Sequence, residues 1–357
     1  MQKIFSPFFI PTKDIDHVIK VVGNNWKKLS NQRLLITGGT GFIGKWMLST
    51  FLHANRELNL SAKVVVVSRN PESFLKNFPN LRDCNEICWV KKDIRELTPE
   101  DCGECSFSIH LATDVNDYNN SVEIFDSCVL GTKRALNAMN LYRGCKRMLI
   151  LSSGAVYRQI PSNAERISED SYREFNLIET EQDYAASKRI SEFQSLNYAS
   201  ENPGFEVTIA RCFSLVGPYL SLNKNFAISD FICSAINNED INIYGDGTPL
   251  RSYLYAADLS HWLWKILFDA PTGSIYNVGG SKSISILELA LKVNTLIGSS
   301  GRIKILKKLD LNNYHQSYLP SLNRIFTELN LSEAFSLDQA IIKTASWLKT
   351  NFNVNSR

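Results

Sequence analysis

The sequence predicts an α/β protein: a doubly wound parallel sheet with a smaller, interleaved α/β lobe. From residue 33 to about residue 213, short and continuously apolar segments alternate with longer segments whose apolar residues recur at helical spacing. Such strands are buried on both faces, which is typical of parallel sheets covered by helices on both sides. A glycine-rich turn joins the first strand to the first helix. After residue 213, longer connections loosen the pattern and indicate the second lobe.

The expected elements follow one another regularly along the chain. An amphipathic segment from Asp14 to Leu29 comes first, and we expect it to pack on the domain that follows. The expected strands are 33–39, 62–70, 86–93, 107–113, 146–153 and 206–213. The expected helices are 44–58, 121–144, 184–202, about 285–297 and about 336–352.

The composition is that of an ordinary globular chain. Hydrophobic residues make up 44% and charged residues 21% of its 357 residues. A net charge of +3 is too small to favour nucleic acid or a membrane surface as a partner. No apolar run approaches the roughly 20 residues that span a bilayer, and residues 1–16 lack the pattern of a signal peptide. We therefore expect a cytoplasmic protein.

Four of the eight cysteines raise the question of a zinc site. Cys102 and Cys105 have CxxC spacing, but Cys84 and Cys88 are separated by three residues and no histidine stands among the four. Cys88 also falls in an apolar segment that we expect to be a buried strand. We therefore expect free thiols and no metal site.

The segment ITGGTGFIG (36–44) places Gly38, Gly41 and Gly44 between an apolar strand and an amphipathic helix. Glycines in this context allow a tight turn and close approach of the backbone to a pyrophosphate, which rests on the helix N-terminus. The segment therefore predicts a Rossmann-type dinucleotide site, with Phe42 and Ile43 also at the cofactor. The alternative is a glycine-rich turn without a ligand.

The end of the second strand, at Ser68 and Arg69, bears on the choice of cofactor. An acidic residue commonly stands there in NAD sites, where it binds the ribose hydroxyls. Arg69 can pair with the 2′-phosphate of NADP, and Ser68 can donate a hydrogen bond to it. This favours NADP(H) over NAD(H); a solvated surface arginine is the alternative.

These observations divide the chain into three expected parts. They are an N-terminal helical extension (1–30), an NADP-binding Rossmann domain (31–212 and about 241–280) and a substrate-binding lobe (213–240 and 281–357).

Tyr184 and Lys188 stand four residues apart at the start of an expected helix, so both side chains lie on one face. A cation fixed beside a tyrosine stabilises the phenolate and moves its pKa from about 10 toward working pH, as acid–base catalysis requires. The helix follows the strand that ends at Ser153. The three residues are therefore the candidate catalytic set.

With these motifs the chain resembles the extended short-chain dehydrogenase/reductases, the family of nucleotide-sugar epimerases, dehydratases and reductases. The resemblance covers about residues 32–290. Its further marks are Asp93-Ile94, His110-Leu111-Ala112, Ser153 four residues before Tyr157, Arg211 with Gly217-Pro218, and YGDGTPLRSYLY (244–255).

The resemblance implies a role for each catalytic residue. Tyr184 would exchange a proton with the sugar oxygen, and Ser153 would hydrogen-bond the same oxygen. Lys188 would bind the nicotinamide ribose and tune Tyr184, while hydride passes between the sugar carbon and the nicotinamide.

The resemblance also implies binding residues. Those for the cofactor are Asp93 and Ile94 at the adenine, and Leu111, Ala112 and Thr113 after the fourth strand. Those for a nucleotide-diphosphate sugar are Ser153, Ser214, Asn225, Tyr244, Arg251 and Asn277. Core packing is the alternative for Tyr244. Cys128, Ser214 and Ser252 depart from the family pattern, so the exact substrate pose does not carry over.

The two residues after Ser153 narrow the reaction. In 4,6-dehydratases of the family, Asp and Glu typically stand there and eliminate water, whereas this chain has Gly154 and Ala155. Dehydration is therefore disfavoured. The NADP prediction favours NADPH-dependent reduction of the 4-keto group of a nucleotide-linked 4-keto-6-deoxyhexose. The alternatives are a C4 epimerase with retained NAD(P) and a non-catalytic NADP-binding protein.

The resemblance finally implies a homodimer and, by analogy, a role in the biosynthesis of surface polysaccharide. Helices near 121–141 and 184–200 would pair across a two-fold axis. Their helix-spaced apolar residues could equally belong to the core of one chain.

Overall fold

The computed structural model describes residues 10–113, 121–140, 147–157, 166–171, 183–222, 226–307 and 317–351. The chain divides into two compact units. The first unit comprises residues 1–158, 172–211 and 260–276, and the second comprises 159–171, 212–259 and 277–357.

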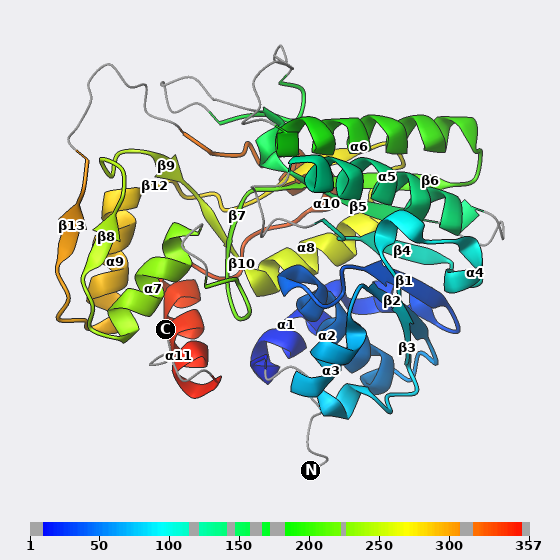
Figure 1. Ribbon diagram of the computed structural model, residues 1–357, viewed down its shortest axis with the longest axis horizontal. Helices are drawn as coiled ribbons and strands as arrows, with labels where there is room; N and C mark the ends of the chain where they lie inside the picture. The colour runs from blue at the N-terminus through cyan, green and yellow to red at the C-terminus, as the bar shows by residue number, and fades with distance from the viewer. Residues whose placement is uncertain are drawn as a thin grey trace. The chain divides into compact units, whose positions relative to one another are not determined.

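A seven-stranded sheet forms the centre of the first unit (Figure 1), with the strand order β11-β6-β5-β4-β1-β2-β3. The strand pairs β1–β2, β1–β4, β2–β3 and β4–β5 are parallel. The strands are β1 (Arg33–Thr37), β2 (Lys63–Ser68), β3 (Ile87–Lys91), β4 (Phe107–His110), β5 (Arg147–Ser153), β6 (Glu206–Cys212) and β11 (Ile275–Val278). The predicted fold class is confirmed.

Helices cover this sheet, and the inner strands are apolar because both of their faces are buried. Val64, Val65 and Val66 of β2, for example, are at most 1% exposed. The main helices are α2 (Phe42–Glu57), α3 (Pro71–Asn77), α4 (Pro99–Cys102), α5 (Ser121–Asn140), α6 (Asp183–Glu201) and α8 (Ala256–Asp269). Within the described ranges, none of the helices combines the length and the apolar character that crossing a bilayer requires.

The expectation that Cys88 is buried is wrong. β3 is the edge strand of the sheet, where the faces are less fully covered than at the central strands, and Cys88 is exposed. Cys84, Cys102 and Cys105 are buried free cysteines. Burial raises the pKa of the Cys84 thiol to about 11 and that of Cys102 to about 12, so both thiols are protonated at neutral pH.

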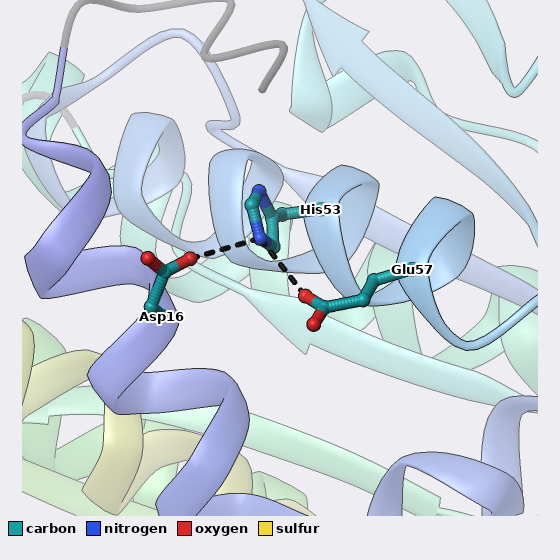
Figure 2. Close-up of side chains that lie close together, drawn as sticks. All are labelled: Asp16, His53 and Glu57. Atoms are coloured by element: carbon teal, nitrogen blue, oxygen red, sulfur yellow. Dashed lines mark ion pairs between the residues drawn. The ribbon is translucent and has the colours of Figure 1, made fainter. Parts of the chain in front are cut away.

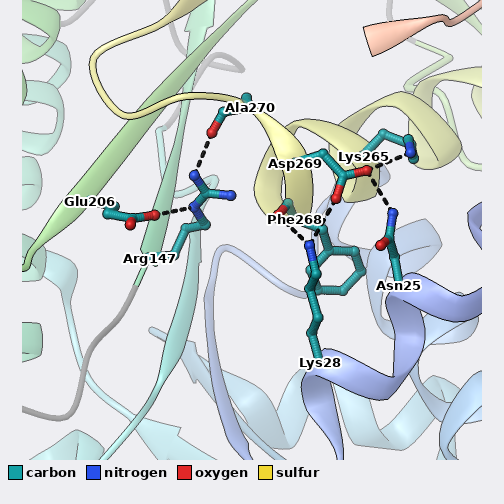
Figure 3. A network of polar contacts seen from close by, with 8 residues as sticks. All are labelled: Asn25, Lys28, Arg147, Glu206, Lys265, Phe268, Asp269 and Ala270. Carbon is teal, nitrogen blue, oxygen red and sulfur yellow. Dashed lines mark hydrogen bonds and ion pairs between the residues drawn. The ribbon is translucent and has the colours of Figure 1, made fainter.

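The N-terminal extension forms α1 (Thr12–Val22) and a 3₁₀-helix (Gly23–Leu29) that pack within the first unit. Trp26 is fully buried, and its ring lies 4.7 Å from that of Trp264 on α8. Lys28 Nζ donates to the carbonyl of Phe268 (2.8 Å) and to Asp269 (2.9 Å), as Figure 3 shows. A cation beside the last carbonyls of a helix is favourable, so the extension covers the C-terminal end of α8.

The second unit is built from three short strand pairs and the helices beside them. The pairs are β7 (Ser214–Val216) with β10 (Tyr253–Tyr255), β9 (Leu250–Arg251) with β12 (Ile284–Ser285), and β8 (Ile241–Ile243) with β13 (Ile303–Ile305). Its helices are α7 (Ala227–Ile236), α9 (Ile286–Ile297), α10 (Asn323–Leu329) and α11 (Leu337–Asn351).

The boundary between the units differs from the one expected near residues 241–280. The structure assigns 241–259 and 277–280 to the second unit and only 260–276 to the first. The physical reason is strand pairing, since β8, β9 and β10 all pair with strands of the second unit. The functions expected of the two units stay predictions.

Candidate functional site

The glycine turn between β1 and α2 needs glycine for steric reasons at Gly38 and Gly44. Gly38 has a φ of +70°, and a Cβ there would lie 2.9 Å from the backbone nitrogen of Ala112. A Cβ on Gly44 would collide with the Gly38 carbonyl and with Gly39. The turn is therefore packed closely against the segment after β4 and against the start of α2.

The N-terminus of α2 can accept an anion. Gly41 occupies the N-cap position and provides no side-chain cap, and the first turn contains no acidic residue. A Cβ on Gly41 would meet only the Gly38 oxygen, at 3.4 Å. Since the first N–H groups of a helix lack partners within the helix, an uncapped N-terminus beside glycine backbone fits a pyrophosphate. The predicted residues Gly38, Gly41, Phe42, Ile43 and Gly44 lie together at this point.

Thr37 and His110, at the ends of β1 and β4, form the floor beneath this turn. Thr37 Oγ1 accepts from the backbone N–H groups of Leu111 and Ala112, each at 3.2 Å, and lies 2.8 Å from His110 Nδ1. Both lone pairs of the hydroxyl are then occupied, so its hydrogen goes to Nδ1. This assigns the ring proton to Nε2, which lies 3.2 Å from the hydroxyl of Thr132.

The hydrogen bonds assigned to His110 require a neutral imidazole, and the pKa of its side chain agrees with this. Complete burial, with a smaller contribution from the Lys188 charge, lowers the pKa of His110 to about 3. The imidazole is therefore neutral at physiological pH and accepts from Thr37 without competition from a proton. The resemblance drew attention to His110, but its partner Thr37 carried no sequence signal of its own.

Tyr184 and Lys188 share one face of α6, as their spacing predicted. Lys188 is 5% exposed, and its Nζ donates to Thr113 Oγ1 (2.7 Å) and to the carbonyl of Leu151 (2.9 Å). The same Nζ lies 5.9 Å from the centre of the Tyr184 ring. The contacts with the ends of β4 and β5 fix the cation, so its field acts on the tyrosine from a constant position.

Ser153 is the last residue of β5, and its hydroxyl accepts a hydrogen bond from the N–H of Ala155 at 3.1 Å. Gly154 and Ala155 begin the 3₁₀-helix Gly154–Tyr157, on which α6 packs. The structure thus places Ser153 at the carboxyl edge of the sheet beside α6, with no acid or base at the next two positions.

A buried polar network adjoins the candidate catalytic residues. Arg211 on β6 donates to both carboxylate oxygens of Glu192 on α6, at 2.9 and 2.7 Å, and to the hydroxyl of Tyr157 at 2.7 Å. Ser152, the neighbour of Ser153, donates to the same carboxylate. Sequence reasoning noted Arg211 only as a family mark and missed Glu192, although Glu192 follows Lys188 by one helical turn.

Ser68 and Arg69 lie at the end of β2, beside the glycine turn. The hydroxyl of Ser68 is 3.5 Å from that of Thr40, and the carbonyl of Thr40 accepts a hydrogen bond from Lys45 Nζ at 2.6 Å. Burial lowers the pKa of Lys45 to about 8. Lys45 was missed by sequence reasoning; a lysine directly after the last glycine of the motif was the available signal.

Asp93 and Ile94 are placed at the start of a short 3₁₀-helix after β3. Asp93 accepts from Arg95 Nε and Nη2, each at 2.9 Å, and this pairing is the main reason why the pKa of Asp93 is lowered. Ile94 is 8% exposed and belongs to the main core cluster. The adenine contact that the resemblance implies for them stays a prediction.

Of the substrate residues implied by the resemblance, Ser153 lies in the first unit, whereas those described in the second unit have different environments. Tyr244 is 54% exposed, so the alternative of core packing is wrong. Arg251 is half-buried, desolvation lowers its pKa, and its guanidinium lies 5.7 Å from the Tyr318 ring centre. Ser214 begins β7, and Asn225 lies outside the described residues.

Asn277 is fully buried in the second unit. Its side-chain amide donates to the carbonyls of Ile167 (2.8 Å) and Ser321 (3.2 Å), while its backbone N–H donates to Glu169 (2.8 Å). Both amide hydrogens are thus used within the unit. Asn277 therefore connects its own strand to the chain segments near residues 167 and 321.

The comparison with protein families agrees with this geometry. The model of the NAD dependent epimerase/dehydratase family matches residues 34–279. The chain belongs to this family. The predicted resemblance is confirmed.

The chain is similar to curated members of the family with different activities. It is 27% identical to UDP-glucuronic acid decarboxylase 1 of Xenopus tropicalis, over 89% of this chain and 72% of that protein. It is 23% identical to dTDP-glucose 4,6-dehydratase of Streptomyces niveus, over 89% and 93%. The expectation that dehydration is disfavoured, which rests on Gly154 and Ala155 alone, is not supported by these relatives.

Solved structures show the same fold. The UDP-glucuronic acid 4-epimerase of Bacillus cereus in complex with NAD has a TM-score of 0.75 at 21% identity, covering 90% of this chain and 100% of that one. The UDP-glucose 4-epimerase of Thermotoga maritima with UDP-glucose has a TM-score of 0.74 at 16% identity, covering 89% and 99%.

The floor of the site yields a first prediction, for Thr37→Val. Valine has nearly the same shape but leaves the N–H of Ala112 and the buried His110 Nδ1 without this partner, whereas the N–H of Leu111 keeps its bond to the backbone oxygen of residue 37. An unsatisfied buried polar group costs about 1–3 kcal/mol, so urea unfolding should show a loss of at least this size. Thr37→Ser keeps the hydroxyl and is the matched control. A valine variant as stable as the wild type would contradict the assigned network.

Proposed function

We propose that the protein reduces the 4-keto group of a nucleotide-linked 4-keto-6-deoxyhexose with NADPH. The observation that carries this proposal is the Tyr184–Lys188 pair, with Lys188 anchored by Thr113 and Leu151 and Ser153 at the neighbouring strand end. This set can move one proton to or from a sugar oxygen. It fits the family membership and the nucleotide-sugar enzymes among the relatives.

In the proposed reaction, each residue has a separate role at the substrate oxygen. When bound, the nicotinamide cofactor supplies the hydride. Tyr184 donates the proton that converts the carbonyl oxygen to a hydroxyl, and Ser153 donates a hydrogen bond that holds that oxygen in place. Lys188 stabilises the phenolate that Tyr184 leaves behind. Arg251, a half-buried cation of the second unit, is proposed to bind the diphosphate.

Two other reactions use the same residues. C4 epimerisation needs the same proton transfer in both directions, and solved epimerases share the fold. The curated relatives add decarboxylation of UDP-glucuronic acid and dehydration of dTDP-glucose to the reactions to be tested. Gly154 and Ala155 argue for the reactions that need no second acid–base pair.

The test is the absorbance at 340 nm of purified enzyme with NADPH and 4-keto-6-deoxyhexoses linked to dTDP, CDP, GDP or UDP. We expect stoichiometric loss of NADPH with one of them. Tyr184→Phe should lower kcat roughly 10²- to 10⁴-fold, because one general acid contributes that much.

The alternative reactions are distinguished by incubating the enzyme with UDP-glucuronic acid or with nucleotide-linked glucoses and identifying the products by NMR. Turnover of these sugars without net NADPH loss would show that the enzyme catalyses epimerisation, decarboxylation or dehydration and not the proposed reduction. Full cellular activity of Tyr184→Phe would instead favour the non-catalytic alternative.

We further propose that the cofactor is NADP(H). Arg69 lies at the end of β2 next to Ser68, and Lys45 reaches the neighbouring Thr40 carbonyl, so two cations accompany the hydroxyls of Ser68 and Thr40. A 2′-phosphate would compensate the desolvation of Lys45. An acidic side chain, which would repel that phosphate, is absent at residues 68 and 69.

This proposal predicts that Arg69→Asp weakens NADPH binding roughly 10- to 150-fold, the equivalent of one charge-assisted hydrogen bond of about 1.5–3 kcal/mol. NADH binding should change little. Fluorescence titration of both cofactors measures the ratio. Arg82→Asp is the control, because Arg82 is an exposed arginine that pairs with Glu72 elsewhere in the first unit. Equal losses for NADH and NADPH would refute the assignment of Arg69.

We also propose a homodimer through α5 and α6, which pack on each other within the first unit. Part of their apolar surface is core, but a second part faces solvent. The exposed apolar residues are Val122 (69%), Phe125 (41%), Leu130 (45%), Ile190 (38%) and Phe193 (66%). Exposed apolar clusters of this kind mark interaction surfaces.

Phe193→Glu is therefore expected to convert a dimer to a monomer in sedimentation experiments at micromolar concentration, with an unchanged circular dichroism spectrum. Leu58→Glu is the matched control, since Leu58 is an exposed apolar residue (42%) at the end of α2. A wild-type chain that sediments as a monomer would exclude the dimer.

A further inference from the structure

Three side chains with metal-binding atoms converge where α1 packs on α2, as Figure 2 shows. Asp16 comes from α1. His53 and Glu57 come from α2, where four residues separate them and place both on one helix face. Asp16 precedes residue 34, where the match to the family model begins, so this cluster includes a residue outside the family region.

The two carboxylates approach the same ring nitrogen. His53 Nε2 lies 3.1 Å from Asp16 Oδ1 and 3.0 Å from Glu57 Oε2, and the three ligand atoms all lie within 4.8 Å of one another. One nitrogen carries at most one hydrogen, so the two carboxylates would have to share that hydrogen in a weaker three-centre bond. A cation placed among the three atoms would instead interact directly with the nitrogen and with both carboxylate oxygens.

We propose that Asp16, His53 and Glu57 bind a divalent transition-metal ion, Zn²⁺ being the best fit. Zinc binds imidazole and carboxylate ligands at about 2.0–2.2 Å, and tetrahedral geometry then places ligand atoms roughly 3.4 Å apart. The two nitrogen–oxygen distances would need to open by only a few tenths of an ångström. Two carboxylates also neutralise the charge of the ion.

The surroundings of the cluster allow the ion to enter. The His53 side chain is 9% exposed, whereas those of Asp16 and Glu57 are 48% and 56% exposed. The imidazole is thus held by the protein while the carboxylates face solvent, where a water molecule can take the fourth position. A nitrogen ligand favours zinc over magnesium or calcium, which prefer oxygen.

The bound ion would tie the N-terminal extension to α2, the helix that starts at the glycine turn. The role we infer is therefore a metal-dependent attachment of α1, separate from the reaction at Tyr184.

The test is calorimetric titration of the full-length, untagged and EDTA-treated protein with ZnCl₂, and with MgCl₂ for comparison. We expect one Zn²⁺ per chain and no binding of Mg²⁺. Asp16→Asn, His53→Gln and Glu57→Gln should each weaken Zn²⁺ binding at least about tenfold, since even loss of an outer-shell partner of a metal ligand costs 10- to 100-fold. Glu72→Gln, at an exposed glutamate on α3, should leave it unchanged.

A second readout concerns α1 itself. Zn²⁺ should slow tryptic cleavage at Lys20 in the wild type but not in Asp16→Asn, whose circular dichroism spectrum verifies folding. Because Cys88 is an exposed thiol, Cys88→Ser is titrated in parallel. The proposal is overturned if Zn²⁺ does not bind, if all three ligand variants bind it like the wild type, or if only Cys88→Ser loses it.

Discussion

The buried ion pair between Arg211 and Glu192 is the contact on which the geometry of the candidate site depends. The side chains are 9% and 5% exposed, and a charge removed from water to this extent is tolerated only when it is paired and hydrogen-bonded. Ser152 and Tyr157 complete the network. It therefore joins β6 and the turn after β5 to the two elements that carry the candidate catalytic residues, the end of β5 with Ser153 and α6 with Tyr184 and Lys188.

Much of this arrangement could be predicted from local sequence patterns. Apolar strands alternating with helices indicated the parallel sheet, the glycines located the turn after β1, and the spacing of Tyr184 and Lys188 placed both on one face. Each of these signals lies within a few consecutive residues. These features could therefore be predicted without knowledge of contacts between distant parts of the chain.

Features that depend on distant contacts could not be predicted in this way. Thr37 and His110 are 73 residues apart, and only the pairing of β1 with β4 brings them together. The exposure of Cys88 depends on the place of β3 at the sheet edge, and the burial of Asn277 depends on segments near residues 167 and 321. Strand order and the packing of the second unit decide these cases.

The neutral state of His110 has a consequence for kinetic work on this protein. An imidazole beneath a candidate cofactor site commonly complicates the interpretation of pH–rate profiles, because histidine ordinarily titrates in the neutral range. Here burial moves that titration to strongly acidic pH. An inflection near neutrality is therefore expected to come from another group, and a His110 variant would lose the contacts with Thr37 and Thr132 without identifying that group.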